Sequence, residues 1–177
     1  HKRQIVWENV YGDTKLYTLS LSMSATDEPV IAFSVSGTPV ELKLARQVAG
    51  EWQLESLLTD DAIGYSAMIV EKIDTTEQVH ISYLNWNQWV IKHVYHDQAG
   101  WLAEEVDMVR KAGIGASMVL DAQGYAHFSY RTYSPKEDTL KYAYQNAAGF
   151  HMETVSAGPF GLSDLALDSN ENPHIAY

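Results

Sequence analysis

The sequence predicts an all-β protein, a β-propeller built of four-stranded antiparallel blades. Three motifs recur in one order with a period of about 47 to 50 residues, a repeat length typical of propeller blades. Each repeat holds short stretches in which apolar residues alternate and which end at turn residues, the pattern of β-strands. No segment keeps a helical apolar period over three turns, so we expect helix to be nearly absent.

The first motif places a large apolar residue three positions before a glutamate and another apolar residue two positions after it. Its glutamates are Glu8, Glu55, Glu104 and Glu153, which lie 47, 49 and 49 residues apart. We expect the motif to form the outer strand of each blade. The glutamates would then face solvent at a sheet edge, and the large residues would pack between blades.

The second motif carries one histidine per repeat, at His80, His127 and His174, with a spacing of 47 residues in both intervals. A third, serine-containing strand motif precedes each of these copies. Histidines at the same register of neighbouring blades repeat one local role. The pattern therefore favours buried, hydrogen-bonded rings over a metal site.

The motifs indicate a single propeller domain over residues 1–177, with about four blades. Residues 1–16 would form the outer strand of a split blade, complete blades would span 17–64, 65–114 and 115–161, and 162–177 would begin the next blade. Either the last blade is split between the two termini, or the chain is a segment of a longer propeller that further blades or another copy complete. Because Tyr177 ends the sequence within a motif, the second arrangement is favoured.

The run from Leu120 to Tyr130, followed by residues 140–143 and 150–155, resembles the tandem propeller repeats of bacterial and archaeal extracellular proteins. Residues 167–177 repeat its start, so the resemblance covers nearly the whole chain. It implies an extracellular or periplasmic location and brings no catalytic residues with it. A more distant similarity joins these blades to BNR or sialidase-like blades, although the turn at 121–124 lacks the tryptophan of their Asp-box.

The composition excludes several kinds of partner. The net charge is −11 at pH 7 and the 12 lysines and arginines are scattered, so neither nucleic acid nor an anionic membrane is expected to bind. No apolar stretch approaches the ~20 residues that would insert across a bilayer. Asp121 and Asp168 are explained by turn capping. Calcium would require several converging oxygens and no motif supports it, so no cofactor is predicted.

The residues that do not repeat lie mainly in the loops that join strand d to strand a and strand b to strand c. These loops share one face of a propeller, and variable loops on a regular scaffold commonly carry function. The candidate ligand-binding residues are Asp60, Asp61, Asn85, Trp86, Arg110, Arg131 and Tyr133. Trp86 and Tyr133 are the expected anchors, because aromatic side chains dominate contact surfaces. For Trp86, packing onto its own blade is an equal alternative.

Two functions fit this pattern. The first is a non-catalytic module that binds a glycan or a protein in an extracellular setting, and the second is a propeller-fold polysaccharide hydrolase or lyase. The Ser–His pairs on the second motif repeat, whereas catalytic sets are usually unique, and Asp60 and Asp61 are consecutive residues that would point apart in a strand. Binding is therefore favoured over catalysis.

Overall fold

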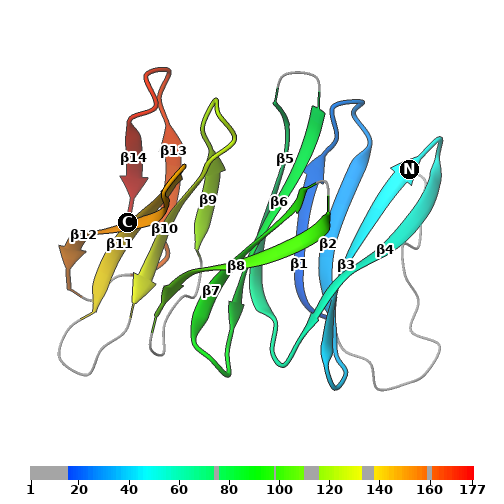
Figure 1. The fold of residues 1–177 in the computed structure, drawn as a ribbon, viewed down its shortest axis with the longest axis horizontal. Coiled ribbons are helices and arrows are strands. Elements are labelled where there is room, and N and C mark those ends of the chain that lie inside the picture. The colour runs from blue at the N-terminus through cyan, green and yellow to red at the C-terminus, as the bar shows by residue number, and fades with distance from the viewer. Residues whose placement is uncertain (1–15, 74–75, 98, 110–115, 133–137, 159–160) are drawn as a thin grey trace.

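A computed structural model describes residues 16–73, 76–97, 99–109, 116–132, 138–158 and 161–177. Four antiparallel sheets stand side by side (Figure 1). The first sheet contains β1 (Leu16–Met23), β2 (Pro29–Val35), β3 (Val40–Val48) and β4 (Glu51–Asp60). The second contains β5 (Gly64–Ile73), β6 (Thr76–Asn85), β7 (Val90–Asp97) and β8 (Gly100–Met108). The third contains β9 (Ser117–Leu120), β10 (Ala126–Thr132), β11 (Thr139–Asn146) and β12 (Gly149–Ala157), and the fourth contains β13 (Asp164–Leu167) and β14 (Pro173–Ala176).

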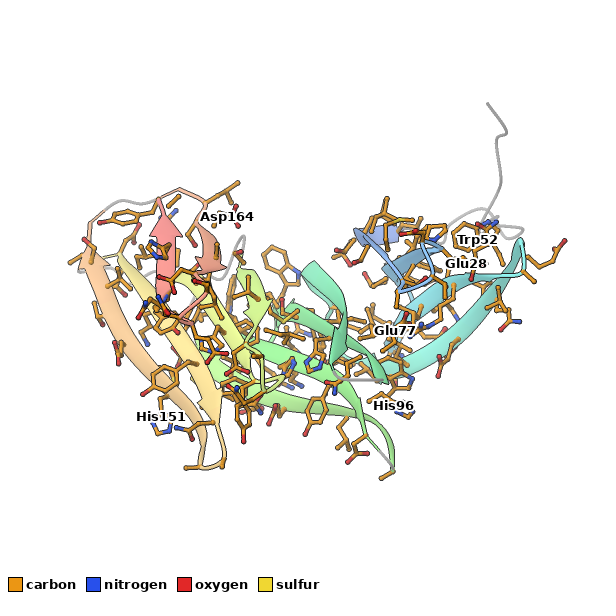
Figure 2. The ribbon with its side chains drawn as sticks, turned by 90° about the horizontal axis from the view of Figure 1, so that it is seen from above. Glu28, Trp52, Glu77, His96, His151 and Asp164 are labelled. Atoms are coloured by element: carbon orange, nitrogen blue, oxygen red, sulfur yellow. The ribbon has the colours of Figure 1, made fainter. Side chains whose placement is uncertain are left out.

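Within each sheet the strands pair in chain order, and the first strands of successive sheets contact one another. Seen from above, the sheets form an open arc with the first and fourth sheets at its two ends (Figure 2). This is the blade arrangement that the sequence predicts. None of the described residues lies in a helix, so this part of the chain offers no helix that could cross a membrane. The predicted outer strand at residues 1–16 lies outside the described residues, apart from Leu16.

In the second and third sheets the second strand is buried on both faces, because neighbouring sheets cover it. In β6 the run from His80 to Leu84 is at most 6% exposed, and in β10 the run from Ala126 to Tyr130 is at most 8% exposed. Apolar side chains of the first and second sheets form one core, and those of the second and third form another. Each fully buried leucine, isoleucine or phenylalanine contributes about 1.5–3 kcal/mol to folding.

A β-bulge recurs where the fourth strand pairs with the third. The register shifts by one residue so that Leu57, Val106 and Val155 are each left without a cross-strand partner. These residues are the apolar position of the first sequence motif. A bulge increases the local twist, which suits sheets that fan around an axis.

The turns between the first two strands of the third and fourth sheets explain Asp121 and Asp168. Oδ1 of Asp121 accepts hydrogen bonds from the backbone N–H groups of Gln123 and Tyr125, at 2.9 and 2.8 Å. Oδ1 of Asp168 does the same for Asn170 and Asn172. A hydrogen bond from the Asn172 side chain, together with these backbone bonds, holds the pKa of Asp168 well below its usual value. Capping thus occupies both carboxylates, as their position in the sequence predicts.

The repeated histidines divide into two groups. His80 and His127 are buried, at 6% and 8% exposure, and hydrogen-bonded, as the sequence predicts. The prediction is wrong for His174, whose side chain is 68% exposed. The reason is that Tyr142 on the third strand of its sheet bonds and covers His127, whereas the fourth sheet has only two described strands.

A polar chain runs through the core from His80 to the third sheet. His80 Nδ1 lies 2.8 Å from His93 Nε2, and His93 Nδ1 lies 3.0 Å from Glu104 Oε1. The same oxygen accepts a hydrogen bond from Gln145 of the next sheet at 2.9 Å. Glu104 therefore links two blades, and Glu55 does likewise by accepting the indole N–H of Trp101 at 2.7 Å. Glu55 and Glu153 are exposed, as the sequence predicts, whereas Glu104 is half-buried between two sheets.

We predict that His127→Ala lowers the free energy of unfolding by ~1–3 kcal/mol, because it leaves a cavity and removes the partner of the Tyr142 hydroxyl. His174→Ala is the matched control, since the same repeat position is exposed there and should change stability by less than ~0.5 kcal/mol. Urea unfolding of both variants provides the measurement. Equal losses in the two would contradict the burial argument.

We also predict an acid sensitivity that originates at His80. Burial, together with the neighbouring His93, lowers the pKa of His80 to about 3 from 6.5. The unfolded chain therefore binds a proton that the folded chain excludes, and stability falls as the pH drops from 6.5 toward 3. The loss should be about 2 kcal/mol between pH 6.5 and pH 5. His80→Gln, which cannot be protonated, should show a shallower pH dependence in urea unfolding, and an unchanged slope would refute the assignment.

Candidate functional site

The candidate site is a hollow of about 190 Å³ where the first sheet meets the second. It is lined by Val40, Asp61, Ala62, Ile63 and Trp86. The short link from β4 to β5 supplies three of these residues, and the loop between β6 and β7 supplies Trp86. These are loops of the two kinds in which the sequence predicts a ligand site.

Gly64 determines where the Trp86 ring lies. A Cβ atom added to Gly64 would meet Trp86 Nε1 at 1.6 Å, so only glycine lets the indole lie across the start of β5. The ring also meets Trp89 edge to face, with centroids 5.9 Å apart. Trp86 therefore packs on its own sheet, which is one of the two interpretations, and it also lines the hollow.

Asn85 is fully buried and connects the two loops of the site. Its Nδ2 donates to Oδ1 of Asp60 at 2.9 Å and to Oδ1 of Asp61 at 2.6 Å. Its Oδ1 accepts from the backbone N–H groups of Asn87 and Gln88, at 3.0 and 2.9 Å. Since its donors and acceptor are engaged inside the protein, Asn85 positions the site.

Asp60 belongs to a structural cross-link between blades. Its Oδ2 accepts from the Tyr83 hydroxyl at 2.6 Å and from Lys92 Nζ at 2.9 Å. Burial alone would raise the pKa of Asp60, but the hydrogen bonds from Tyr83 and Lys92 lower it to about 2. Burial and the same carboxylate raise the pKa of Tyr83 far above its usual value. Asp60 is therefore a charged, paired group at neutral pH.

The same cross-link occurs at the next interface. Asp107 of β8 accepts from the Tyr130 hydroxyl at 2.8 Å and from Lys141 Nζ at 2.7 Å. Tyrosines 83 and 130 are 47 residues apart, and lysines 92 and 141 are 49 apart. This repeated spacing was a usable signal that the sequence-based prediction did not include. Because the same cross-link recurs at the next interface, we infer that Asp60 helps to hold adjacent blades together.

Asp61 is exposed at the rim of the hollow. Because the amide of Asn85 contacts Oδ1 of both Asp60 and Asp61, the two carboxylates lie on the same side of the chain. The expectation that they point apart is wrong, since Asp61 follows the last residue of β4 and no longer obeys strand alternation.

Of the remaining candidates, the structure describes only Arg131, which does not join this site. Arg131 lies on β10 of the third sheet, and its guanidinium pairs with Asp138. Arg110 and Tyr133 lie outside the described residues. Across the part of the chain that the structure describes, no group of three or more histidine, aspartate or glutamate side chains could hold a metal ion.

We predict that Asn85→Leu lowers the free energy of unfolding by ~2–4 kcal/mol, because buried carboxylate and backbone groups lose their partner. Asn87→Ala is the control, since Asn87 is exposed and should change stability by less than ~0.5 kcal/mol. Urea unfolding measures both effects. An unchanged midpoint for Asn85→Leu would show that the amide does not hold the loops together.

Comparisons with known proteins agree with this architecture. No family model matches the chain, and no curated protein matches it. The chain is similar to the solved structure of a fucose lectin from Kordia zhangzhouensis in complex with methyl-fucoside, with a TM-score of 0.50 and 14% sequence identity. The match covers 77% of this chain and 97% of the lectin chain. At this identity the likeness concerns the fold, and nothing in it supports a link to sialidase-like blades. The chain thus has an all-β fold of antiparallel, blade-like sheets similar to that of a bacterial fucose lectin.

Proposed function

We propose that this chain is a non-catalytic carbohydrate-binding module that holds a sugar residue in the hollow beside Trp86. One observation carries the proposal: an indole ring, apolar side chains and an exposed carboxylate line the same hollow. A sugar ring presents an apolar face that stacks on an aromatic ring, and hydroxyl groups that donate to a carboxylate. Asp61 would accept those hydrogen bonds.

The size of the hollow suits a single sugar ring. Its volume of about 190 Å³ is below the ~300–1,000 Å³ typical of sites for drug-sized ligands. A ligand of this size would contact two sheets at once, Trp86 on the second and Val40 on the first. A protein ligand would need a larger contact surface, so the hollow favours a glycan.

Charge narrows the ligand class further. Asp61 borders the hollow and the chain carries a net charge of −11, so sugars that bear a carboxylate would be repelled. Neutral sugars are therefore the proposed ligands. The similar lectin was solved in complex with methyl-fucoside, which makes methyl-fucoside the first neutral sugar to test here.

The geometry favours binding over hydrolysis. Most glycoside hydrolases use two carboxyl groups, one of which must carry a proton near neutral pH. Asp60, whose carboxylate shares the Asn85 amide with Asp61, has a pKa lowered to about 2 and is held by Tyr83 and Lys92. It would therefore remain charged and could not act as the acid.

An extracellular or periplasmic setting, taken from the resemblance of the repeats, is part of this proposal.

We predict that Trp86→Ala weakens binding of methyl-fucoside at least ~30-fold, the loss expected when an aromatic anchor is truncated. Asp61→Asn should weaken it ~10-fold, because a charged acceptor becomes a neutral one. Isothermal titration measures both, and a glycan array extends the ligand search to other neutral sugars.

Trp101→Ala is the matched control, since Trp101 lies on the outer strand β8 and bonds Glu55. It should leave affinity unchanged. Melting temperatures establish that each variant is folded, and Trp86→Phe keeps a ring against Gly64 if the alanine variant is unstable. If folded Trp86→Ala and Asp61→Asn bind every array ligand as the parent does, the site is wrong. Release of reducing ends or unsaturated uronates from a polysaccharide would favour the enzymatic alternative.

A further inference from the structure

The loop between β6 and β7 contains a second tryptophan, Trp89, whose backbone adopts an unusual conformation. Its φ is +56°, in the left-handed region that residues with bulky side chains rarely occupy. Glycine or asparagine would adopt this conformation at a lower cost in free energy. A tryptophan at this position therefore indicates that the indole side chain has a role that offsets the strain of the backbone.

The indole of Trp89 contacts both a core and the ring that lines the proposed sugar site. It is partly buried and packs against the core shared by the second and third sheets, which includes Ile91, Val109 and Phe128. Trp86 packs against the same core. The two indole rings meet edge to face, with centroids 5.9 Å apart and an angle of 77° between their planes. Trp89 thus connects close-packed side chains to the ring beside the hollow.

The backbone of this loop is held at both of its ends. At the start, Oδ1 of Asn85 accepts hydrogen bonds from the backbone N–H groups of Asn87 and Gln88. At the end, the carbonyl oxygen of Trp89 accepts the N–H of Val109 at 2.7 Å. Val109 is 1% exposed and belongs to the same core. Trp89 is therefore joined to this core by its backbone and by its side chain.

A stacking ring binds a sugar best when it is already fixed in the free protein. A ring that rotates freely must lose rotamer freedom on binding, and this loss weakens the affinity. Gly64 leaves room for the indole of Trp86 across the start of β5, but a glycine has no side chain with which to hold it. The edge-to-face contact with Trp89 supplies a side chain that restricts rotation of the Trp86 ring.

We propose that Trp89 is a positioning residue of the sugar site, and that its indole braces the Trp86 ring in the orientation that receives the sugar. This inference rests on the proposed function of the hollow. The bracing is a property of the free protein, so it can be measured without a ligand. In the binding reaction Trp89 acts through Trp86.

The first test is the affinity for methyl-fucoside, measured by isothermal titration. Trp89→Asn removes the indole and suits a left-handed backbone, so the loop should keep its conformation. Its affinity should be ~3–10-fold weaker than that of the parent, the loss expected when one side chain must be ordered on binding. Trp89→Phe keeps a ring beside Trp86 and should recover most of the affinity. Gln88→Ala is the matched control, because Gln88 is exposed in the same loop, and it should bind as the parent does.

The second test is spectroscopic and separates positioning from a general loss of stability. The electronic transitions of two indoles that are close and nearly perpendicular should couple, which gives the parent a split band in far-ultraviolet circular dichroism. Trp89→Asn and Trp86→Phe should lose this band, whereas Trp101→Ala should keep it. His127→Ala, which should be less stable because of a change on the third sheet, should keep the parent's affinity per folded chain.

Three results would overturn the role of Trp89. They are a Trp89→Asn variant that binds methyl-fucoside as tightly as the parent, a split band that this variant retains, and an equal loss of affinity in Gln88→Ala. Melting temperatures verify folding, and Trp89→Gly replaces the asparagine variant if that variant is unfolded. A parent chain that binds no sugar would instead overturn the sugar site itself, on which the role of Trp89 depends.

Discussion

The requirement that every sheet be covered on both faces governs this structure. A central strand such as β6 or β10 carries apolar side chains on both sides, so a single blade cannot bury them alone. Neighbouring sheets must supply the cover. The chain meets this requirement by repeating one blade, so that one face of each sheet packs on the opposite face of the next. Equivalent positions make the apolar contacts of the first two interfaces.

Polar groups fit into this packing only where they are paired. The carboxylates of Asp60 and Asp107 reach across an interface to a tyrosine and a lysine of the following sheet, and Glu104 reaches a buried histidine and the next blade. Each of these groups would be costly to bury alone. The hollow lined by Trp86 and Asp61 lies beside the bonds that Asp60 makes between the first and second sheets. The candidate site is thus a product of blade packing.

The same requirement explains why residues at one repeat position differ in exposure between the ends of the arc and its interior. His127 and His174 occupy one repeat position, but the first is buried and the second exposed, because Tyr142 has no described counterpart in the fourth sheet. Leu21 and Met118 also occupy one repeat position, opposite Ile31 and Phe128, and the first is exposed whereas the second is buried. Side chains with the chemistry of an interior are exposed where no neighbouring sheet among the described residues covers them.

The amino-acid sequence alone determined the blade architecture, because strand alternation and a fixed repeat are local properties that survive without knowledge of the fold. It also predicted the capped turns at Asp121 and Asp168, and it named the four residues that the structure gathers at one interface, Asp60, Asp61, Asn85 and Trp86. Their roles were decided only by tertiary structure. Asn85 and Asp60 turned inward because partners from another strand or sheet lay within bonding distance, and Arg131 lies apart on the third sheet. Burial of His80 but not of His174 likewise depends on the neighbouring strands, since a repeat specifies the residue at a position but not whether another strand covers it.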